Sequence, residues 1–373
     1  MHVVLVKQSA KQAGGLEKAA LRIANAFLAR GDRVTLLSTG QVTAPQGVEV
    51  HALQGSSFFR AQRLERFDAF VSSWLQNLQA DVVLGLDRCR RQTHLRAGNG
   101  VHAVYLERLH ALEGRLKQFA RWISPLHRKL LAVEREAFEY PGLRKVIANS
   151  AMVGREILER FSLRNAKLEV IHNGVEWSEW SEHFASWPQA RLNMCRELGL
   201  DPAAFHFLFV GHGYARKGLR QLLQGLALLK RSDVHLSVIG QDKHIEQYAK
   251  EARKLGLARQ VHFFGARSDV LRFYQMSDAL VVPSLYDPFA NVTVEALSFG
   301  MSVVSSKYNG GIEVLSPATG VVIDELLDPE SVAEALRAAI LRPKTELRAR
   351  QVRASVEHLD FPKQLAKVLQ VCE

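Results

Sequence analysis

The sequence predicts an α/β protein of two doubly wound, Rossmann-like domains that face each other across a cleft. The 373 residues are too many for one ordinary hydrophobic core. Apolar runs of strand character alternate with helical patterns along the chain, and such alternation builds parallel sheets. The alternation breaks at the Asn173-Gly174 turn. The predicted domains are therefore residues 1–172 and 173–358, and a last helix within 359–373 is expected to cross back to the first domain.

The first half opens with a βαβ unit. Val3–Val6 and Val34–Leu37 have the composition of buried strands, and Gly14-Gly15 forms a turn between them. The helix predicted after that turn ends at Gly31, because glycine is common at the position just after the last turn of a helix. Its apolar residues recur at steps of four, three and four: Leu16, Ala20, Ile23 and Phe27. Further strands are predicted at Val48–Leu53, Val82–Leu86 and Val146–Asn149.

The second half repeats this alternation more clearly. Its predicted strands are Phe207–Gly211, Leu236–Gly240, Val261–Gly265, Ala279–Pro283 and Ser302–Ser306. Its predicted helices are Leu219–Lys230, about 243–256, a short one from Asp269, 291–300 and Pro329–Leu341. Ligands of doubly wound folds bind at the carboxyl ends of the strands. A ligand is therefore expected between the two domains, although the fold by itself selects no reaction.

The positive charge is confined to the first half of the chain. The net charge is +11; residues 1–175 hold 26 Lys and Arg against 15 Asp and Glu, and the remainder hold 23 of each. An acidic partner is expected for the first half. Nucleic acid, anionic lipid and a phosphorylated acceptor all fit, and so does a surface whose charge only keeps the protein in solution.

The cysteines and the N-terminus indicate a cytoplasmic protein. Cys89, Cys195 and Cys372 lie far apart without a C-x-x-C spacing, which argues against a disulfide framework or a structural zinc site. The N-terminus has too short an apolar stretch for a signal peptide, and no run approaches the ~18 apolar residues of a membrane span. The chain is expected to be soluble or peripheral.

Two segments of the second half carry chemistry. Arg216 and Lys217 follow a strand end between two glycines, where a backbone can approach a diphosphate and two fixed charges can bind it. In residues 283–296, Asp287 precedes a helix and Glu295 lies about one turn inside it. The amides of about 289–292 are donors of that helix start. A sugar diphosphate matches this order of groups, although an acid-capped helix with an exposed Glu295 also fits.

Taken together, these segments resemble the family-4 retaining glycosyltransferases of GT-B fold. The resemblance covers nearly the whole chain and includes Gly14-Gly15-Leu16-Glu17, His172-Asn173-Gly174-Val175, Gly211 with Arg216-Lys217-Gly218, Phe263-Phe264-Gly265-Ala266-Arg267, and the segment from Asp287 to Glu295. Within the family the chain is most similar to the bacterial lipopolysaccharide-core glucosyltransferase that glucosylates heptose. The local similarity runs through residues 240–243 and 261–264.

The resemblance implies a role for each matching residue. Arg216 and Lys217 would hold the diphosphate, Glu295 the ribose, and Arg267 the base. Asp287 would contact the transferred sugar, together with backbone amides at the helix start: Phe289, Ala290, Asn291 and Val292. Gly15 would let the loop of the first domain close over the phosphates. The family commonly has glutamate where Asp287 stands, which leaves the choice of sugar open.

Catalytic assistance is assigned to His102. It lies in the glycine-flanked segment 96–102, where relatives carry a histidine or aspartate that faces the donor sugar, and a structural histidine is the alternative. Asn99 stands where an acid is expected. No Asp-x-Asp triplet occurs, so a metal-independent transferase is predicted. No cofactor is expected. The predicted donor is a UDP-sugar, with UDP-glucose preferred.

A basic amphipathic helix is predicted over 105–123. Its apolar residues recur at helical spacing, and Arg108, Arg115, Lys117 and Arg121 occupy other positions, with Trp122 near the end. Such a helix suits contact with anionic lipid, although packing on its own domain explains the stripe equally well. The predicted partners are a nucleotide-sugar donor, an anionic glycolipid acceptor and the inner face of the cytoplasmic membrane, with no nucleic acid.

Other functions stay open. A nicotinamide-dependent oxidoreductase shares the fold but calls for G-x-G-x-x-G in the first βαβ unit, which Gly14-Gly15 does not supply. A nucleic-acid-binding protein accounts for the basic half but not for the segment from Asp287 to Glu295. A catalytically silent nucleotide-sugar-binding protein, or a family-4 transferase with another lipid or polysaccharide acceptor, remains as the alternative.

Overall fold

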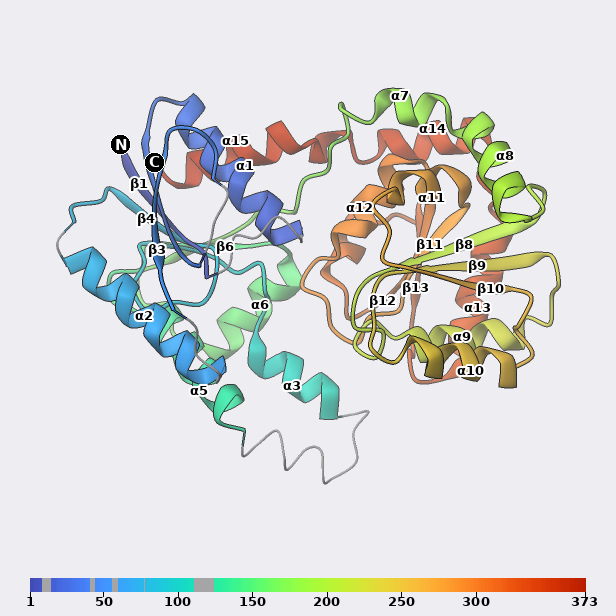
Figure 1. The fold of residues 1–373 in the computed structure, drawn as a ribbon, viewed down its shortest axis with the longest axis horizontal. Coiled ribbons are helices and arrows are strands. Elements are labelled where there is room, and N and C mark those ends of the chain that lie inside the picture. The colour runs from blue at the N-terminus through green and yellow to red at the C-terminus, as the bar shows by residue number, and fades with distance from the viewer. Residues whose placement is uncertain (9–14, 41–43, 56–59, 77, 111–123) are drawn as a thin grey trace. The chain divides into compact units, whose positions relative to one another are not determined.

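The computed structural model describes residues 1–8, 15–40, 44–55, 60–76, 78–110 and 124–373. The chain divides into two compact units (Figure 1). Unit 1 comprises Met1–His172 and Gln364–Glu373, and unit 2 comprises Asn173–Lys363. The first boundary follows His172, where the sequence analysis sets it. The chain returns to unit 1 after Lys363 rather than after residue 358, within the last helix.

Unit 1 is a parallel sheet covered by helices. The strand order is β3-β2-β1-β4-β5-β6-β7. The strands are β1 (His2–Val6), β2 (Arg33–Thr39), β3 (Val48–Leu53), β4 (Val82–Gly85), β5 (His94–Arg96), β6 (Lys145–Ala148) and β7 (Lys167–Val170). The helices are α1 (Gly15–Ala29), α2 (Arg60–Gln76), α3 (His102–His110), α5 (Pro125–Phe138), α6 (Ala151–Arg160) and α15 (Phe361–Val371), which starts in unit 2.

Alternate residues of β1 enter two different cores because side chains of a strand point to opposite faces. Val3 and Leu5 pack with α1 and with Cys372, which follows α15. Val4 and Val6 pack with residues of α2 such as Phe67. Both faces of the sheet are therefore covered, which explains why the strand reads as a continuous apolar run.

Unit 2 has the strand order of a Rossmann fold. The order is β10-β9-β8-β11-β12-β13, all parallel. The strands are β8 (Phe205–Val210), β9 (Val234–Ile239), β10 (Val261–Gly265), β11 (Ala279–Val282), β12 (Ser302–Ser306) and β13 (Gly320–Ile323). The helices are α7 (Ser181–Ala185), α8 (Trp187–Leu198), α9 (Leu219–Leu228), α10 (Ile245–Lys254), α11 (Val270–Met276), α12 (Asn291–Ser298), α13 (Pro329–Ile340) and α14 (Glu346–Ala354). The prediction of two Rossmann-like α/β domains is confirmed.

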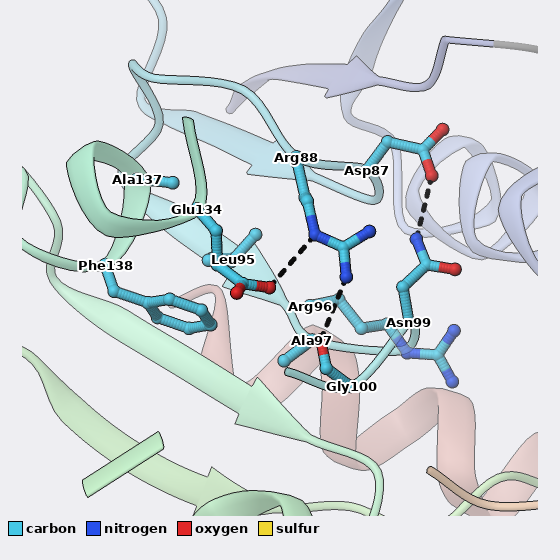
Figure 2. A pocket seen from close by; sticks show the side chains of 10 residues that line it. All are labelled: Asp87, Arg88, Leu95, Arg96, Ala97, Asn99, Gly100, Glu134, Ala137 and Phe138. Atoms are coloured by element: carbon cyan, nitrogen blue, oxygen red, sulfur yellow. Dashed lines mark hydrogen bonds and ion pairs between the residues drawn. The ribbon is translucent and has the colours of Figure 1, made fainter. Parts of the chain in front are cut away.

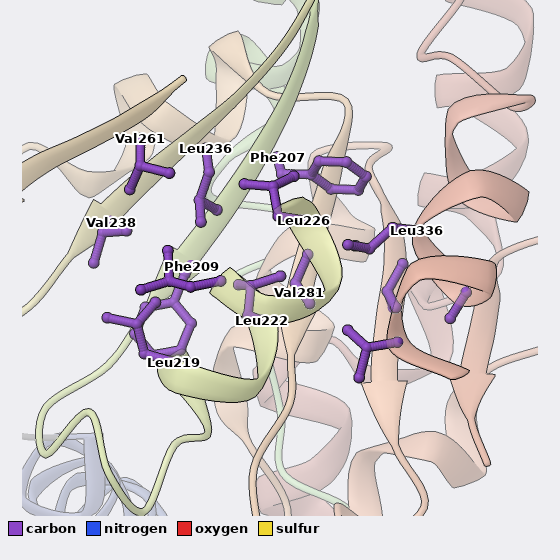
Figure 3. Packing of buried hydrophobic residues seen from close by; sticks show 14 of the residues in the cluster. Phe207, Phe209, Leu219, Leu222, Leu226, Leu236, Val238, Val261, Val281 and Leu336 are labelled. Atoms are coloured by element: carbon purple, nitrogen blue, oxygen red, sulfur yellow. The ribbon is translucent and has the colours of Figure 1, made fainter. Parts of the chain in front are cut away.

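The main core of unit 2 lies between the sheet and the neighbouring helices α9 and α13 (Figure 3). Leu222 and Leu226 of α9 lie over Phe207 and Phe209 of β8. Each such side chain contributes about 1.5–3 kcal/mol by leaving water. The helices approach closely because α9 carries Gly225: a Cβ there would lie 2.5 Å from Cγ1 of Val332.

Short strands and the basic helix mark where structure and sequence analysis differ. β5, β7 and β13 are three or four residues long and were not predicted, since so short a run shows no periodicity. Of the predicted helix over 105–123, the structure describes α3, and residues 111–123 lie outside the described part. No helix among the described residues is both long and apolar enough to span a bilayer.

Three histidines lie side by side across unit 2. His206 of β8, His235 of β9 and His262 of β10 have ring centroids 5.5 and 5.4 Å apart. Burial lowers the pKa of His206 to about 4 and also lowers the pKa values of His235 and His262. The folded protein therefore keeps these rings neutral at a pH where the unfolded chain protonates them.

This histidine row predicts a pH-dependent stability. The unfolded chain binds protons below its ordinary histidine pKa of about 6.5, so the free energy of unfolding falls as the pH drops from about 6.5 towards 4. For His206 alone the loss at pH 5 is about 2 kcal/mol. Thermal melts at pH 7.5 and 5 should show a smaller decrease in Tm for His206→Gln than for the wild type. The exposed-site control His244→Gln should keep the full decrease, and an unchanged decrease in His206→Gln would contradict the assignment.

Candidate active site

The strand order of unit 2 reverses between β8 and β11. These two strands are hydrogen-bonded neighbours, and the chain leaves them towards opposite sides of the sheet. Ligands of open α/β sheets bind outside the carboxyl ends at such a switch point. The loops that follow these strands are residues 211–218 and 283–290, the two segments selected from the sequence.

A close backbone approach joins the two loops. The amide of Leu285 donates to the carbonyl of Arg216 at 3.0 Å. Gly218 has φ +75°, and a Cβ at this position would lie 1.8 Å from the carbonyl oxygen of Pro283. Only glycine lets the chain turn here against the neighbouring loop. The distance between the loops is therefore fixed by backbone atoms.

The side chains at this junction form an ion pair with a surplus cation. Nζ of Lys217 lies 2.5 Å from Oδ2 of Asp287, and Nη1 of Arg216 lies 3.7 Å from the same oxygen. Lys217 and Asp287 are largely buried, at 13% and 10% side-chain exposure, whereas Arg216 is 37% exposed. Two cations share one carboxylate, so this group keeps one positive charge directed at the strand ends. It can attract an anion.

Asn309 fastens the Asp287 loop to the end of β12. The residues on either side of Asn309 are hydrogen-bonded to the loop. The amide of Asp287 donates to the carbonyl of Tyr308, and the amide of Gly310 donates to the carbonyl of Asp287. The buried Oδ1 of Asn309 accepts from the amides of Ala290 and Gly311, each at 3.0 Å. The amide of Ala290 donates to Asn309 in this structure, and its contact with the donor stays a prediction.

The remaining donors stand at the start of α12. The first amides of a helix have no acceptor within the helix, and for α12 they belong to Asn291 and Val292. Phe289, just before the helix, is buried, and the side chain of Asn291 accepts from Nδ2 of Asn173 at 2.7 Å. One turn further, Oε2 of Glu295 accepts from the hydroxyl of Tyr274 at 2.6 Å. An ion pair, helix amides and a carboxylate thus follow one another along one segment.

Arg267 is held apart from this arrangement. Its guanidinium forms two hydrogen bonds to Asp269, at 2.8 and 2.7 Å, and lies over the ring of Phe273. Hydrogen bonding to Arg267 lowers the pKa of Asp269. The contacts in the structure do not bring Arg267 together with Arg216 or Lys217, and its contact with a base stays a prediction.

His102 begins α3 in unit 1. Its amide donates to both oxygens of the buried carboxylate of Glu134, at 2.9 and 3.0 Å. Its Nε2 lies 3.0 Å from Nδ1 of His127. Glu134 also accepts from Arg88 at 3.0 Å. The backbone at His102 is therefore anchored by Glu134, and the imidazole is held by the ring of His127.

A small cavity of about 20 Å³ lies at the carboxyl ends of β4 and β5 (Figure 2). Arg88 stands between Glu134 and the carbonyl of Gly100, and Asn99 reaches Asp87 with a 3.1 Å hydrogen bond. The cavity is lined by Asp87, Arg88, Leu95, Arg96, Ala97, Asn99, Gly100, Glu134, Ala137 and Phe138. Asn99 thus donates to the acid Asp87 rather than standing in its place. Asp87 was not predicted from the sequence.

The other predicted residues are placed as follows. Gly15 is the first residue of α1, and Arg108 is exposed on α3. Arg115, Lys117, Arg121 and Trp122 lie outside the described residues. Tyr274, Asn309 and Asp87 were missed because each acts through contacts with residues far away in the sequence. Among the described residues, His, Cys, Asp and Glu side chains form no group of three suited to a metal ion.

Two family models match this chain, one for each half. "Glycosyltransferase Family 4" matches residues 13–179, and "Glycosyl transferases group 1" matches residues 193–357. The chain belongs to the family-4 glycosyltransferases of GT-B fold. The resemblance inferred from the sequence is confirmed, and the protein is a glycosyltransferase.

Relatives of this transferase include a lipopolysaccharide glucosyltransferase. It is 26% identical over 333 residues to lipopolysaccharide glucosyltransferase WaaG of Escherichia coli K12, covering 88% of this chain and 86% of that protein. A crystal structure of WaaG superimposes with a TM-score of 0.82 at 24% identity, covering 99% of both chains. HepE of Anabaena in complex with UDP-glucose matches with a TM-score of 0.71 at 18% identity, again covering 99% of both. These structural matches support the fold.

The contact at Gly218 predicts a large loss of stability on substitution. Gly218→Ala combines a positive φ with a Cβ placed against the Pro283 carbonyl, so the free energy of unfolding should fall by more than about 3 kcal/mol. Gly256→Ala is the matched control, because Gly256 has φ +77° with open space around its Cβ position, and should cost about 1 kcal/mol. Urea unfolding measures both. Equal losses would show that the contact between the loops is not tight.

Proposed function

We propose that this transferase moves a hexose, with glucose preferred, from a UDP-sugar to an anionic glycolipid. The reaction retains the anomeric configuration and uses no metal ion. The observation that carries the proposal is the pair of cations at the β8/β11 switch point, Arg216 and Lys217, next to Asp287. A nucleotide sugar presents a diphosphate, and this group has the charge and the position to receive it.

In the proposed reaction the bond between the anomeric carbon and the diphosphate oxygen breaks, and its electron pair stays on the nucleoside diphosphate. Lys217 and Arg216 stabilise that negative charge, aided by the amides at the start of α12. Asp287 holds Lys217 in place before the donor arrives and accepts a hydrogen bond from the transferred sugar. Glu295 accepts hydrogen bonds from the ribose hydroxyls.

The acceptor hydroxyl oxygen forms the new bond on the face that the nucleotide leaves, which retains the configuration. Its proton passes to the oxygen of the departing diphosphate. His102 assists by hydrogen bonding to the sugar or the leaving group. The contacts of its amide with Glu134 and of its ring with His127 support this role, because the first fixes the backbone at the helix start and the second holds the imidazole. Gly15 and Arg267 are proposed to contact the phosphates and the base.

The acceptor is proposed to be a lipopolysaccharide core or another anionic glycolipid, met at the inner face of the cytoplasmic membrane. The relative named lipopolysaccharide glucosyltransferase and the excess positive charge of residues 1–175 support this choice. A catalytically silent nucleotide-sugar-binding protein is the second candidate, and the same donor site would serve it. Measured turnover separates the two.

Lys217→Ala should abolish most of the transfer. The departing diphosphate loses its nearest buried cation, so kcat for release of UDP from UDP-glucose should fall by about 100-fold or more. The control Lys254→Ala removes an exposed lysine of α10 and should leave kcat unchanged. Wild-type turnover in Lys217→Ala would place the diphosphate elsewhere. In the same assay EDTA should have no effect on the wild type, and loss of activity in EDTA would overturn the metal-free reaction.

Binding to anionic membranes is expected to depend on the basic segment. Replacing Arg108, Arg115, Lys117 and Arg121 by Ala should abolish co-sedimentation with phosphatidylglycerol vesicles, since each basic residue contributes about 1 kcal/mol near an anionic surface. A variant that removes four charges from unit 2 at Lys243, Lys250, Arg253 and Lys254 controls for net charge and should still sediment. Binding that does not differ between anionic and neutral vesicles would contradict this account.

A further inference from the structure

Tyr274 is a buried tyrosine whose hydroxyl meets the candidate ribose-binding carboxylate. It lies on α11 with almost no exposed surface, and its hydroxyl donates to Oε2 of Glu295 at 2.6 Å. Its ring stacks on Phe299, with centroids 5.6 Å apart. The ring therefore belongs to the core of unit 2, while the hydroxyl is the part that reaches the site.

The hydroxyl acts as a donor. A carboxylate at neutral pH only accepts, so the proton of this hydrogen bond belongs to Tyr274. Burial and the neighbouring Glu295 raise the pKa of Tyr274 well above its ordinary value, which keeps the hydroxyl protonated. Hydrogen bonds with one charged partner are short and strong, and this one fixes one oxygen of Glu295.

The position of Tyr274 is itself fixed from behind. Nζ of the buried Lys344 donates to the carbonyls of Tyr274 and Gln275, at 3.0 and 3.2 Å. Lys344 also lies 4.5 Å from the ring centroid of Trp187. These two hydrogen bonds hold the last turn of α11. The hydroxyl of Tyr274 therefore offers the Glu295 carboxylate a donor at a fixed position.

We propose that Tyr274 is a positioning residue that holds the Glu295 carboxylate towards the donor's ribose and thereby sets the preference for ribonucleotide over deoxyribonucleotide donors. The proposal rests on the proposed function of Glu295. A glutamate side chain has several rotamers. If the side chain is not held in place, binding of a diol has to select the correct rotamer first, which costs conformational entropy. Fixing the carboxylate beforehand favours a ligand with both ribose hydroxyls.

The alternative to a positioning role is a purely structural one, in which the hydroxyl of Tyr274 only donates its hydrogen bond to the nearest acceptor. Both roles lower stability when the hydroxyl is removed. Only the positioning role changes how binding depends on the ribose hydroxyls. The ratio of two dissociation constants measured on the same preparation is independent of the folded fraction, so it separates the roles even in a poorly folded variant.

The test compares Tyr274→Phe with Tyr248→Phe by calorimetric titration with UDP, 2′-deoxy-UDP and 3′-deoxy-UDP. The Kd for UDP should rise about tenfold in Tyr274→Phe, whereas the Kd values for the deoxy nucleotides should change little. KM for the UDP-sugar should rise by a similar factor with kcat nearly unchanged. Tyr248 is a buried tyrosine of the same unit, and its variant should keep the wild-type selectivity.

Glu295→Ala separates failure of this inference from failure of the proposed function. If Glu295→Ala binds UDP as tightly as the wild type, the ribose role of Glu295 is wrong and the inference is overturned with it. If Glu295→Ala weakens UDP binding and Tyr274→Phe keeps the wild-type ratio, only the positioning role is overturned. In the double variant Tyr274→Phe should add nothing to Glu295→Ala, and an additive loss would also overturn the positioning role.

Discussion

The candidate active site depends on the ion pair between Lys217 and Asp287 across the β8/β11 switch point. Largely buried charges are stable only when paired, so each of the two loops needs the other. The backbone approach at Gly218 sets the separation, and Asn309 holds the Asp287 loop against β12. With one carboxylate satisfying Lys217, the more exposed Arg216 leaves the group with a surplus positive charge, which suits an anionic ligand.

Unit 1 contains a similar pair at its own switch point, with a different balance of charge. Lys7 follows β1 and Asp87 follows β4, and their charged atoms are 2.8 Å apart. Asp87 also accepts from the amide of Gln8 and from Asn99. Here one carboxylate serves one cation and two neutral donors, so the pair has no surplus charge. The same fold thus places a surplus cation at the switch point of unit 2, whereas the Lys7–Asp87 pair of unit 1 is balanced and lies beside a small cavity that Arg88, Arg96 and Glu134 also line.

The sequence predicted what depends on local pattern. Strand runs such as Val3–Val6 and 207–210 are apolar on both faces, and the glycine-flanked Arg216-Lys217 loop follows from its place at a strand end. Contacts between distant residues could not be predicted. Nothing near Tyr274 signals that its hydroxyl meets Glu295, because that contact joins α11 to a residue of α12, 21 positions further along the chain. For the same reason, nothing near Ala290 signals that its amide donates to Asn309, 19 residues further along the chain.

The cations at the switch point of unit 2 are proposed to hold the diphosphate of the donor. A crystal structure of the transferase with UDP-glucose tests it most directly. The account predicts diphosphate oxygens within hydrogen-bonding distance of Nζ of Lys217 and of the Arg216 guanidinium, and of the Asn291 and Val292 amides. A diphosphate bound at any other edge of the sheet, with the Lys217–Asp287 pair untouched, would contradict it.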